Sequence, residues 1–512
     1  MKKQMYGIIG LCSAVAVLGG GLAVLKISDH SDSDSGSSSV ETTQEYGAGI
    51  VIVDDSSAPY KAEENAEAKG KVQSVRVANE KSVLDAVIAE PAGESTSAVY
   101  TLKGYEDLNV DSMLVSTLFN NAHGLTSVSI IEDDCSELDK FGLADTAVEV
   151  EITYESGNKK KLYIGDSSPV TSNTYVRLDG SNTVYDVSSS KMSNYKEDVN
   201  YFIDKTVVKK LADAEAVKIL SLEIIRKDIE DEFLIEYDPA SEKETGGGSS
   251  SKYILKKPVE SYVKIEETDE LVNKMFGLTA DGIYALHCGE SDIAGSGLSD
   301  PFCKAVVTCD DGKSYTLLLS ETFKDEDGNE SCYGMLEGGK IIYTFVPENV
   351  TWLTVTPADI LSQNMILSRV WNLSKLDIKC GSTTESFTIE PKESGVDRTK
   401  AKKEQMSVKR NGTEFNVERF RQLYSFIIAV HAEEMAYNEQ IPDTEPMVTL
   451  SYTDEVTKKS ETYEFYEYSA MKCLIAVDGK SKFICSKSYV KTLIDNIGRV
   501  ETGEEYVTSW KN

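Results

Sequence analysis

A hairpin that occurs twice without a gap constrains the fold of this chain more than any other feature. Its first copy runs from Gly142 to Asp166 and its second from Gly297 to Glu321. Each copy reads as a strand, a turn that contains glycine, and a returning strand. Apolar residues alternate along the first strand, which predicts a half-buried β-strand with one face on a core. The alternating residues are Val148, Val150, Ile152 and Tyr154 in the first copy, and Cys303, Ala305, Val307 and Cys309 in the second.

A third version of the same region is marked by a recurring turn. Leu178-Asp179-Gly180, Leu336-Glu337-Gly338 and Val477-Asp478-Gly479 lie roughly 150 residues apart, which is too far for a solenoid repeat. A chain of 512 residues is also too long for one core. We therefore predict an α+β protein with three tandem domains of antiparallel sheet, each with one or two helices on a face. The predicted domains are 49–205, 206–365 and 366–507, followed by a tail at 508–512.

Four segments have the pattern or the place of a helix. The first two repeats contain three predicted helices, at Asp111 to Ala122, Met192 to Phe202 and Asp269 to Met275. In the third repeat an apolar stripe recurs at the spacing of a helix that faces a core. The residues of that stripe are Phe420, Leu423, Tyr424, Ile427 and Ile428.

The N-terminal segment 1–27 predicts a membrane anchor. Met5 to Leu25 is uncharged and mostly apolar, long enough as a helix to cross a hydrocarbon core of about 30 Å. Lys2 and Lys3 precede it and Asp29 follows, so the N-terminus is expected in the cytoplasm and the rest of the chain outside. Residues 28–48 then form a Ser/Asp-rich flexible spacer.

Two alternatives to an uncleaved anchor remain weaker on the sequence. Ala14-Val15-Ala16 fits a signal-peptidase site but lies inside the apolar run. Cys12 would be the lipid-bearing cysteine of a lipoprotein, but bulky Leu11 precedes it where a small residue is required. We expect an uncleaved, single-pass anchor.

The charge balance excludes nucleic acid as a partner. There are 85 acidic and 53 basic residues, with a formal net charge of -32. Because affinity for phosphates depends on clustered Lys and Arg, so acidic a chain is not expected to bind them. The acidity is typical of a solvated surface that stays soluble beside a membrane or cell wall.

No catalytic, cofactor or metal residues are predicted. His30, His123, His287 and His431 fall at positions that do not correspond between repeats, and no hydrolase, zinc-protease or P-loop motif occurs. The run Asp325 to Glu330 resembles a calcium loop, but its glycine is at the wrong position, so we interpret it as an acidic hairpin tip.

Two further patterns have a structural and a functional interpretation. Asp145 and Asp300 follow Gly-Leu in both copies, and we expect each to cap its turn rather than to form an acidic site. Tyrosines on strands are expected mainly to pack on their neighbours, with an aromatic glycan-binding face as the alternative. These tyrosines are Tyr163, Tyr175, Tyr333, Tyr463 and Tyr466.

The cysteines outside the anchor show no metal-binding spacing. One pair, Cys473 and Cys485, flanks the Asp478-Gly479 turn. A three-residue loop would place the two cysteines opposite each other, within reach of a disulfide, whereas a two-residue turn would shift the register and separate them. A disulfide and two buried thiols both remain open.

The first repeat resembles the bacterial family called domain of unknown function 4340. The resemblance rests on Phe141-Gly142-Leu143 with Asp145, on Leu162 to Asp166 and on Tyr175 to Leu178, and it spans roughly Val72 to Lys205. It continues more faintly into the second repeat, and the third repeat lacks Gly-Leu. The resemblance implies a membrane-anchored extracytoplasmic protein associated with ABC transporters of the gliding-motility auxiliary type. The family has no assigned catalytic residues.

Together these features predict a non-enzymatic accessory or scaffold protein of an ABC-type transport or cell-envelope complex. The alternatives are a cell-wall or polysaccharide-binding surface protein, which the strand tyrosines favour, and an uncharacterised hydrolase.

Overall fold

The structure is a computed structural model that describes residues 46–63, 67–93, 95–144, 147–211, 217–242 and 251–510. The predicted anchor Met5 to Leu25 lies outside these residues, as do Asp145 and the predicted spacer up to residue 45. Within the described ranges, no helix has both the length and the apolar character needed to cross a membrane.

The described residues form two compact units, and both are built mainly of sheet. The first unit contains the residues up to Asp107 and those from Ser112 to Val199, and the second contains Leu108–Asp111 and the residues from Asn200 onward. The first holds a small and a large sheet, and the second holds two large sheets. The paired strands run antiparallel. The sheet-rich, antiparallel character predicted from the sequence is confirmed.

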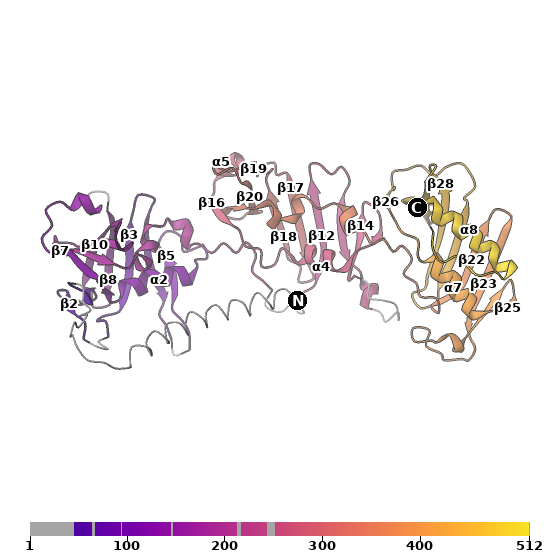
Figure 1. The fold of residues 1–512 in the computed structure, drawn as a ribbon, viewed down its shortest axis with the longest axis horizontal. Coiled ribbons are helices and arrows are strands. Elements are labelled where there is room, and N and C mark those ends of the chain that lie inside the picture. The colour runs from indigo at the N-terminus through magenta and orange to yellow at the C-terminus, as the bar shows by residue number, and fades with distance from the viewer. Residues whose placement is uncertain are drawn as a thin grey trace, which may run out of the picture. The chain divides into compact units, whose positions relative to one another are not determined.

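The large sheet of the first unit has eight strands among the described residues (Figure 1). In spatial order they are β5 (Val99–Leu102), β4 (Val83–Glu90), β3 (Val72–Ala78), β8 (Val148–Tyr154), β9 (Lys159–Ser167), β10 (Thr174–Leu178), β11 (Val184–Val187) and β7 (Ser129–Glu132). The small sheet has the order β2 (Tyr60–Lys61), β1 (Ile50–Val53) and β6 (Leu125–Thr126). The helical segments are α2 (Ser112–Ala122), η1 (Leu138–Phe141), α3 (Ser189–Met192) and η2 (Ser193–Lys196), with η3 (Val199–Phe202) at the boundary of the two units.

One face of this sheet is buried because apolar residues alternate along its strands. Val150, Ile152 and Tyr154 of β8 are fully buried, as the alternation predicts. Helix α2 covers this face, packs on β3 and β5, and buries Val115 and Leu118. The opposite face carries charged cross-strand pairs, which suit a surface in contact with solvent.

The first large sheet of the second unit follows the same plan. In spatial order its strands are β15 (Ser261–Tyr262), β14 (Tyr253–Lys257), β13 (Phe233–Tyr237), β12 (Ile219–Arg226), β17 (Cys303–Cys309), β18 (Ser314–Leu319), β20 (Glu330–Leu336), β21 (Ile341–Phe345) and β16 (Gly282–Leu286), and β19 (Phe323–Lys324) pairs with β20. Its helical segments are η4 (Pro239–Glu242), α4 (Ile265–Asn273), α5 (Glu290–Gly295), η5 (Pro347–Asn349), η6 (Thr351–Leu353) and α6 (Pro357–Ile360). Cys303, Ala305, Val307 and Cys309 are buried along β17, so the alternation of the second hairpin copy is also confirmed.

The second large sheet of this unit is the C-terminal one. In spatial order its strands are β25 (Thr413–Phe415), β24 (Met406–Arg410), β23 (Thr383–Pro391), β22 (Leu373–Cys380), β27 (Val448–Asp454), β28 (Lys459–Glu467), β29 (Lys472–Val477), β30 (Lys480–Ser486) and β26 (Glu434–Met435). Its helical segments are η7 (Lys403–Gln405), α7 (Val417–Ile427) and α8 (Lys487–Thr502), and α7 and α8 lie side by side on the sheet (Figure 1).

The three large sheets share one strand order. Strand β3 lies beside β8 in the first sheet, β12 beside β17 in the second, and β22 beside β27 in the third. A strand from the middle of each sequence segment then crosses to the far edge: β7 pairs with β11, β16 with β21, and β26 with β30. This crossover recurs in all three sheets, so the sequence repeat corresponds to a repeated topology.

The predicted helices agree with the structure to different degrees. Helices α2 and α7 lie where they were predicted, and α4 begins a few residues before Asp269. The segment from Met192 to Phe202 contains short 3-10 turns instead of a continuous helix. Helix α8 was not predicted, although Tyr489, Leu493 and Ile497 repeat at helical spacing and are buried.

Candidate functional site

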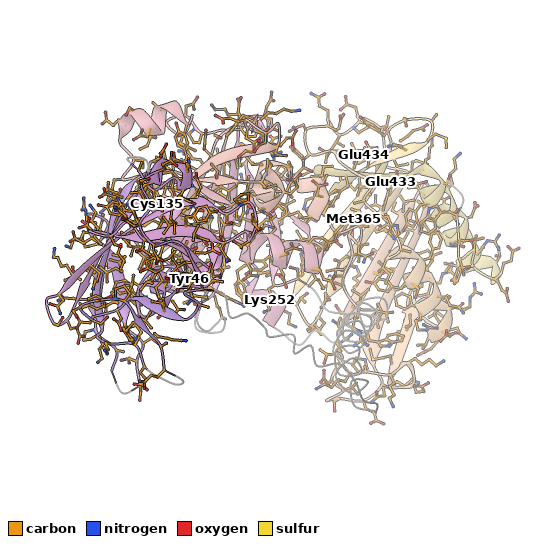
Figure 2. All side chains as sticks on the ribbon, turned by 60° about the vertical axis from the view of Figure 1, so that its left-hand side comes forward. Tyr46, Cys135, Lys252, Met365, Glu433 and Glu434 are labelled. Carbon is orange, nitrogen blue, oxygen red and sulfur yellow. The ribbon has the colours of Figure 1, made fainter. Side chains whose placement is uncertain are left out.

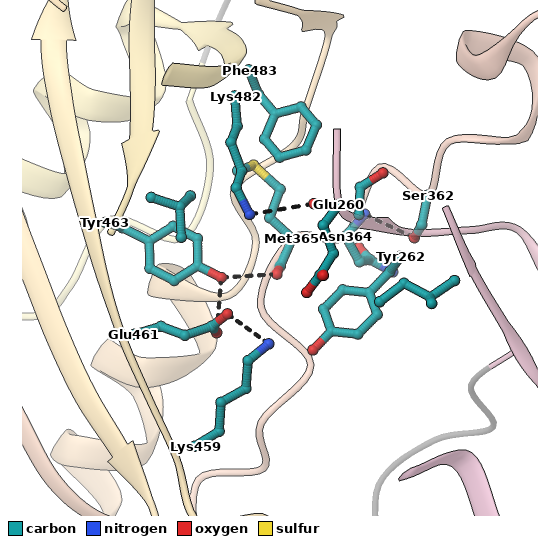
Figure 3. A pocket seen from close by; sticks show the side chains of 13 residues that line it. Glu260, Tyr262, Ser362, Asn364, Met365, Lys459, Glu461, Tyr463, Lys482 and Phe483 are labelled. Carbon is teal, nitrogen blue, oxygen red and sulfur yellow. Dashed lines mark hydrogen bonds and ion pairs between the residues drawn. The ribbon is translucent and has the colours of Figure 1, made fainter. Parts of the chain in front are cut away.

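A small polar cavity in the second unit is lined by several ionisable side chains, among them Glu461, Lys459 and Tyr463. It has a volume of about 30 Å³, which is room for a water molecule or two. One wall comes from the Glu260–Tyr262 segment and from Ser362 to Met365, and the other from strands β28 and β30 (Figure 3). The cavity therefore lies where the two large sheets of this unit meet.

Backbone pairing within the second unit holds the segment that carries Met365 beside the cavity. Asn364 forms an isolated antiparallel bridge with His431, and the amide of Ala432 donates to the carbonyl of Gln363 at 3.1 Å. Figure 2 labels Met365 and Glu433 in this part of the chain. The bridge holds the segment after α6 against the segment before β26.

Glu461 is the central group of the cavity. It lies on β28, its side chain is only 8% exposed, and its carboxylate forms an ion pair with Lys459 at 2.7 Å. Tyr463 Oη donates to the carboxylate at 3.2 Å and also to the carbonyl of Met365 at 3.2 Å. Tyr452, directly opposite on β27, donates to the same carboxylate. The cluster follows from strand geometry, because alternate residues of one strand and their cross-strand partners share a face.

Burial sets the protonation of the two tyrosines. It raises the pKa of Tyr452 and of Tyr463, and the neighbouring Glu461 carboxylate raises both further. Both hydroxyls therefore keep their protons at neutral pH. They act as hydrogen-bond donors to Glu461, not as bases.

Two lysines border the cavity and differ in their environment. Burial by itself would lower the pKa of Lys459. The interactions of its ammonium group with Tyr262 and Glu461 have the larger, opposite effect, so the pKa of Lys459 is raised. Burial lowers the pKa of Lys482 below its usual value, although Glu260 and Glu461 act in the opposite direction. Lys459 is therefore the firmly charged partner of Glu461.

The same side chains join the two sheets of the second unit. Lys482 Nζ donates to the carbonyl oxygen of Glu260 at 3.4 Å, and Lys459 Nζ lies 5.6 Å from the ring centroid of Tyr262. Farther along the junction, the Tyr437 hydroxyl donates to Asp231. Met435 packs against the hydrophobic cores of both sheets. The cavity is part of a packed and hydrogen-bonded joint.

The geometry suits a structural role better than chemistry on a substrate. The carboxylate of Glu461 already accepts from two hydroxyls and an ammonium group, which leaves it little capacity as a base. The volume is far below the roughly 300 Å³ of a small-molecule site. Among the residues that the structure describes, no group of three His, Cys, Asp or Glu side chains is placed to hold a metal ion.

A larger hollow of about 390 Å³ lies between α7 and the segment Glu505 to Thr508. Arg419 and Glu505 are the charged residues that line it, and the guanidinium of Arg419 donates to the carbonyls of Arg499, Gly503 and Glu504 at 2.9 to 3.0 Å. It also lies 4.7 Å from the ring of Tyr506. Arg419 thus holds the chain's own C-terminal segment on α7.

The acidic and histidine residues singled out in the sequence do not come together. His123, His287 and His431 are exposed and lie beside different sheets, while His30 is outside the described residues. Asp300 is exposed and pairs with Lys227 at 2.6 Å. Asp325 accepts from the amides of Asp327 and Asn329 at the tip of a hairpin, which confirms the interpretation of that run as an acidic turn.

The five strand tyrosines mostly pack on their neighbours, as expected. Tyr463 and Tyr466 are buried, Tyr163 lies 3.9 Å from the guanidinium of Arg177, and Tyr175 packs edge-on against Phe141. Tyr333 also packs on its neighbours and, like Tyr163 and Tyr175, is partly buried. It contacts two aromatic rings that the sequence analysis did not single out.

Those two rings belong to Tyr284 and Phe323. Tyr284 is 45% exposed, and its ring centroid lies 4.4 Å from that of Tyr333. The ring centroid of Phe323 lies 4.6 Å from that of Tyr333. The three residues come from β16, β19 and β20, so no local sequence signal predicts the group. We call it the aromatic group.

Comparison with known proteins finds a family model that matches part of the chain. Residues 101–301 match the family model described as Domain of unknown function (DUF4340). No curated protein and no solved structure matches the chain. The match supports the predicted resemblance in the first repeat from residue 101 onward and its continuation into the second repeat as far as residue 301, and it assigns no chemistry.

Proposed function

We propose that this chain is a non-enzymatic scaffold that works outside the cytoplasm beside a membrane transport complex. In this proposal Met5 to Leu25 anchors the chain, residues 28–48 form a tether, and three domains, 49–205, 206–365 and 366–507, provide binding surfaces. The partner that we propose is an ABC-type transporter or another cell-envelope complex.

The observation that carries the proposal is the shared strand order of the three large sheets. A repeated sheet offers the same kind of outer surface several times along one chain, which suits multivalent contact with a large partner. Exposed apolar residues occur on the sheets of both units, including Val83 at 54% and Ile225 at 52% exposure. Such residues can contribute to contacts that a purely charged surface would not make.

The internal use of charge supports the same view. Glu461 is held by Tyr452, Tyr463 and Lys459, and Arg419 is held by backbone carbonyls. Groups that are saturated in this way contribute to rigidity, which a scaffold needs. The hydrolase alternative has no comparable support.

The cellular address in the proposal rests on the sequence. An apolar run preceded by lysines and followed by aspartates favours an anchored chain with its bulk outside the cytoplasm. The family resemblance adds the association with ABC transporters. A tether at the membrane raises the local concentration of the domains near such a complex even when each contact is weak.

Site-specific crosslinking in cells tests the scaffold. A photoreactive amino acid is placed at Val83 or at Ile225 in the full chain, and crosslinked proteins are identified after irradiation. We expect membrane transport proteins to be captured from at least one position. A chain without Met5 to Leu25 is the control and should capture far less. Capture of no membrane protein from either position contradicts the proposal.

The aromatic group favours a second candidate, a cell-wall or polysaccharide-binding protein. Half-exposed aromatic rings provide flat apolar faces of the kind that pack against sugar rings. The group is small, and Tyr333 is partly covered by its neighbours. It therefore ranks behind the scaffold.

A glycan pulldown distinguishes the two candidates. The variants Tyr284→Ala and Tyr333→Ala should reduce retention on cell-wall polysaccharide if the aromatic group binds it. Tyr468→Ala is the matched control, because Tyr468 is also 45% exposed and lies after a strand of the C-terminal sheet. Equal retention of all three variants and the unaltered chain rules out the aromatic group as the glycan site.

A further inference from the structure

Cys473 and Cys485 lie directly opposite each other on neighbouring antiparallel strands. The register of β29 and β30 pairs Cys473 with Cys485, and the connecting turn contains only Asp478 and Gly479. Both turn residues have positive φ, 53° and 76°, as a tight type I′ hairpin requires. The expectation that a two-residue turn would separate the cysteines is wrong, because a register shift between Ile475 and Ala476 restores their alignment.

The two thiols also share a face of the sheet. Cys473 is fully buried and Cys485 is 1% exposed, and both belong to the same hydrophobic core. Cys473 Sγ lies 3.9 Å from Met447 Sδ in that core. Directly opposed residues have Cα atoms about 4.5 to 5.5 Å apart, within the range of about 4.4 to 6.8 Å that a disulfide spans.

We infer that Cys473 and Cys485 form a cross-strand disulfide when the chain folds in the presence of a disulfide oxidant. One thiolate attacks the oxidant, such as oxidised glutathione, and forms a mixed disulfide with release of one thiol. The second thiolate then attacks the mixed disulfide, and a second thiol leaves. The protein loses two hydrogen atoms and two electrons pass to the oxidant, while the structure described here is the dithiol form.

The bond forms before the hairpin is covered. Helix α8 begins directly after β30, packs on β29 and β30, and places Tyr489 and Leu493 in the core that holds both cysteines. Burial raises the pKa of Cys473 to about 11 and also raises the pKa of Cys485. In the folded dithiol form, reactive thiolate is therefore scarce and access for an oxidant is poor.

Other core cysteines provide an internal comparison. Cys303 on β17 and Cys332 on β20 are buried in one core, but β18 lies between their strands. Strands are about 4.8 Å apart, so these two cysteines are separated by about 10 Å, beyond the reach of a disulfide. The pairing is expected to be specific to Cys473 and Cys485.

Disulfide mapping tests the inference. The reduced, unfolded full chain is refolded in detergent with mixed reduced and oxidised glutathione, free thiols are alkylated, and the digest is analysed by mass spectrometry. We expect a linked peptide that contains Cys473 and Cys485, and alkylated Cys303 and Cys332. Alkylation of Cys473 and Cys485 in a chain that regains its circular dichroism spectrum overturns the inference. A bond between Cys303 and Cys332 at similar yield overturns its specificity.

The timing is tested with the same reagents. The oxidant is added to the folded dithiol form, and linkage is expected to be at least about tenfold slower than during refolding. Equal rates overturn the conclusion that the bond precedes the packing of α8. The variant Cys332→Ala is the control and should leave both rates unchanged. This inference does not depend on the proposed function.

Discussion

A Cβ atom on Gly165 would lie 2.1 Å from the carbonyl oxygen of Phe141, so β9 passes under η1 with no room for a side chain. This close approach explains the glycine in the Ile-Gly-Asp sequence of the first repeat. We expect Gly165→Ala to lower the free energy of unfolding by about 1 to 3 kcal/mol, because η1 must move away from the strand. Denaturant titration that follows the unfolding of the first unit measures the change in the free energy of unfolding.

A second glycine gives the opposite expectation and serves as a control. Gly498 lies in α8, is exposed, and has open space where a Cβ would stand. Glycine within a helix costs about 0.5 to 1 kcal/mol relative to alanine, so Gly498→Ala is expected to stabilise the second unit by that amount. Equal effects of the two substitutions would contradict the steric explanation for Gly165.

The ion pair between Glu385 and Arg410 supplies a second prediction. Two hydrogen bonds of 2.6 Å join the side chains, and Glu385 is only 4% exposed. Glu385→Gln removes the negative charge and one of the two acceptor oxygens, which leaves Arg410 without its anionic partner, so a loss of about 3 kcal/mol is expected. Urea unfolding checks it. The matched substitution Glu151→Gln in the exposed pair with Lys159 is expected to cost no more than about 1 kcal/mol.

The third prediction concerns the coupling between Tyr452 and Glu461. A double-mutant cycle with Tyr452→Phe and Glu461→Gln should give a coupling energy of about 1 kcal/mol or more, because the hydrogen bond is buried. The adjacent pair on the opposite face, Ser451 and Thr462, has a hydrogen bond of 3.0 Å. Its cycle should give less than about 0.5 kcal/mol. Similar values for both pairs would contradict a special role for the buried network.

Individual strands of this fold were predictable from the sequence, whereas the order of the strands in each sheet was not. The alternation of apolar residues identified β8 and β17, because the pattern of buried and exposed positions is visible within a few residues of each strand. The pairing of β7 with β11 depends on segments more than fifty residues apart, and Ser129–Glu132 carries no local signal for it. Helix α8 did have a helical pattern, which the strand-rich context obscured.

The candidate site was not predictable for a related reason. Glu461 and Tyr463 look like ordinary alternating strand residues. Their partners Tyr262 and Met365 come from distant segments that only the packing of two sheets brings near. Likewise, the turn at Asp478-Gly479 was recognised, but the register shift that aligns Cys473 with Cys485 has no sequence signature.

Acid should weaken one hydrogen-bonded loop of the first unit. Asp54 is 1% exposed and accepts from the amides of Ser56 and Lys69 and from the hydroxyl of Tyr60. Burial alone would raise the pKa of Asp54, but these hydrogen bonds lower it on balance. The stabilisation is therefore complete above the unfolded-state pKa of about 3.9 and is lost as the pH falls through the lower folded-state pKa.

The variant Asp54→Asn tests this dependence. At pH 7 it should lower the free energy of unfolding by about 1 to 2 kcal/mol, and the difference from the unaltered chain should shrink as the pH falls below about 3.9. Unfolding midpoints measured between neutral and acidic pH give the profile. Tyr60→Phe removes one of the donors and should have a smaller effect with the same pH trend. A difference independent of pH would contradict the assignment.

The proposed topology predicts a labelling pattern. Met113 is 77% exposed on α2, so Met113→Cys should react with a membrane-impermeant maleimide in intact cells. Lys3→Cys lies on the predicted cytoplasmic side and should react only after the cells are opened. The unaltered chain sets the background, because most of its described cysteines are buried. Protection of both positions in intact cells would contradict an extracytoplasmic chain.

The crossover of β7, β16 and β26 has a consequence for how the protein is made. Each of these strands is an edge strand that, among the described residues, pairs within its large sheet only with that sheet's last strand in the sequence, β11, β21 or β30. It therefore leaves the ribosome well before its pairing partner does. It must wait unpaired until that partner emerges. Each sheet can therefore be completed only after its last strand has been synthesised. A nascent chain that stalls before β11, β21 or β30 leaves β7, β16 or β26 without its partner in the sheet.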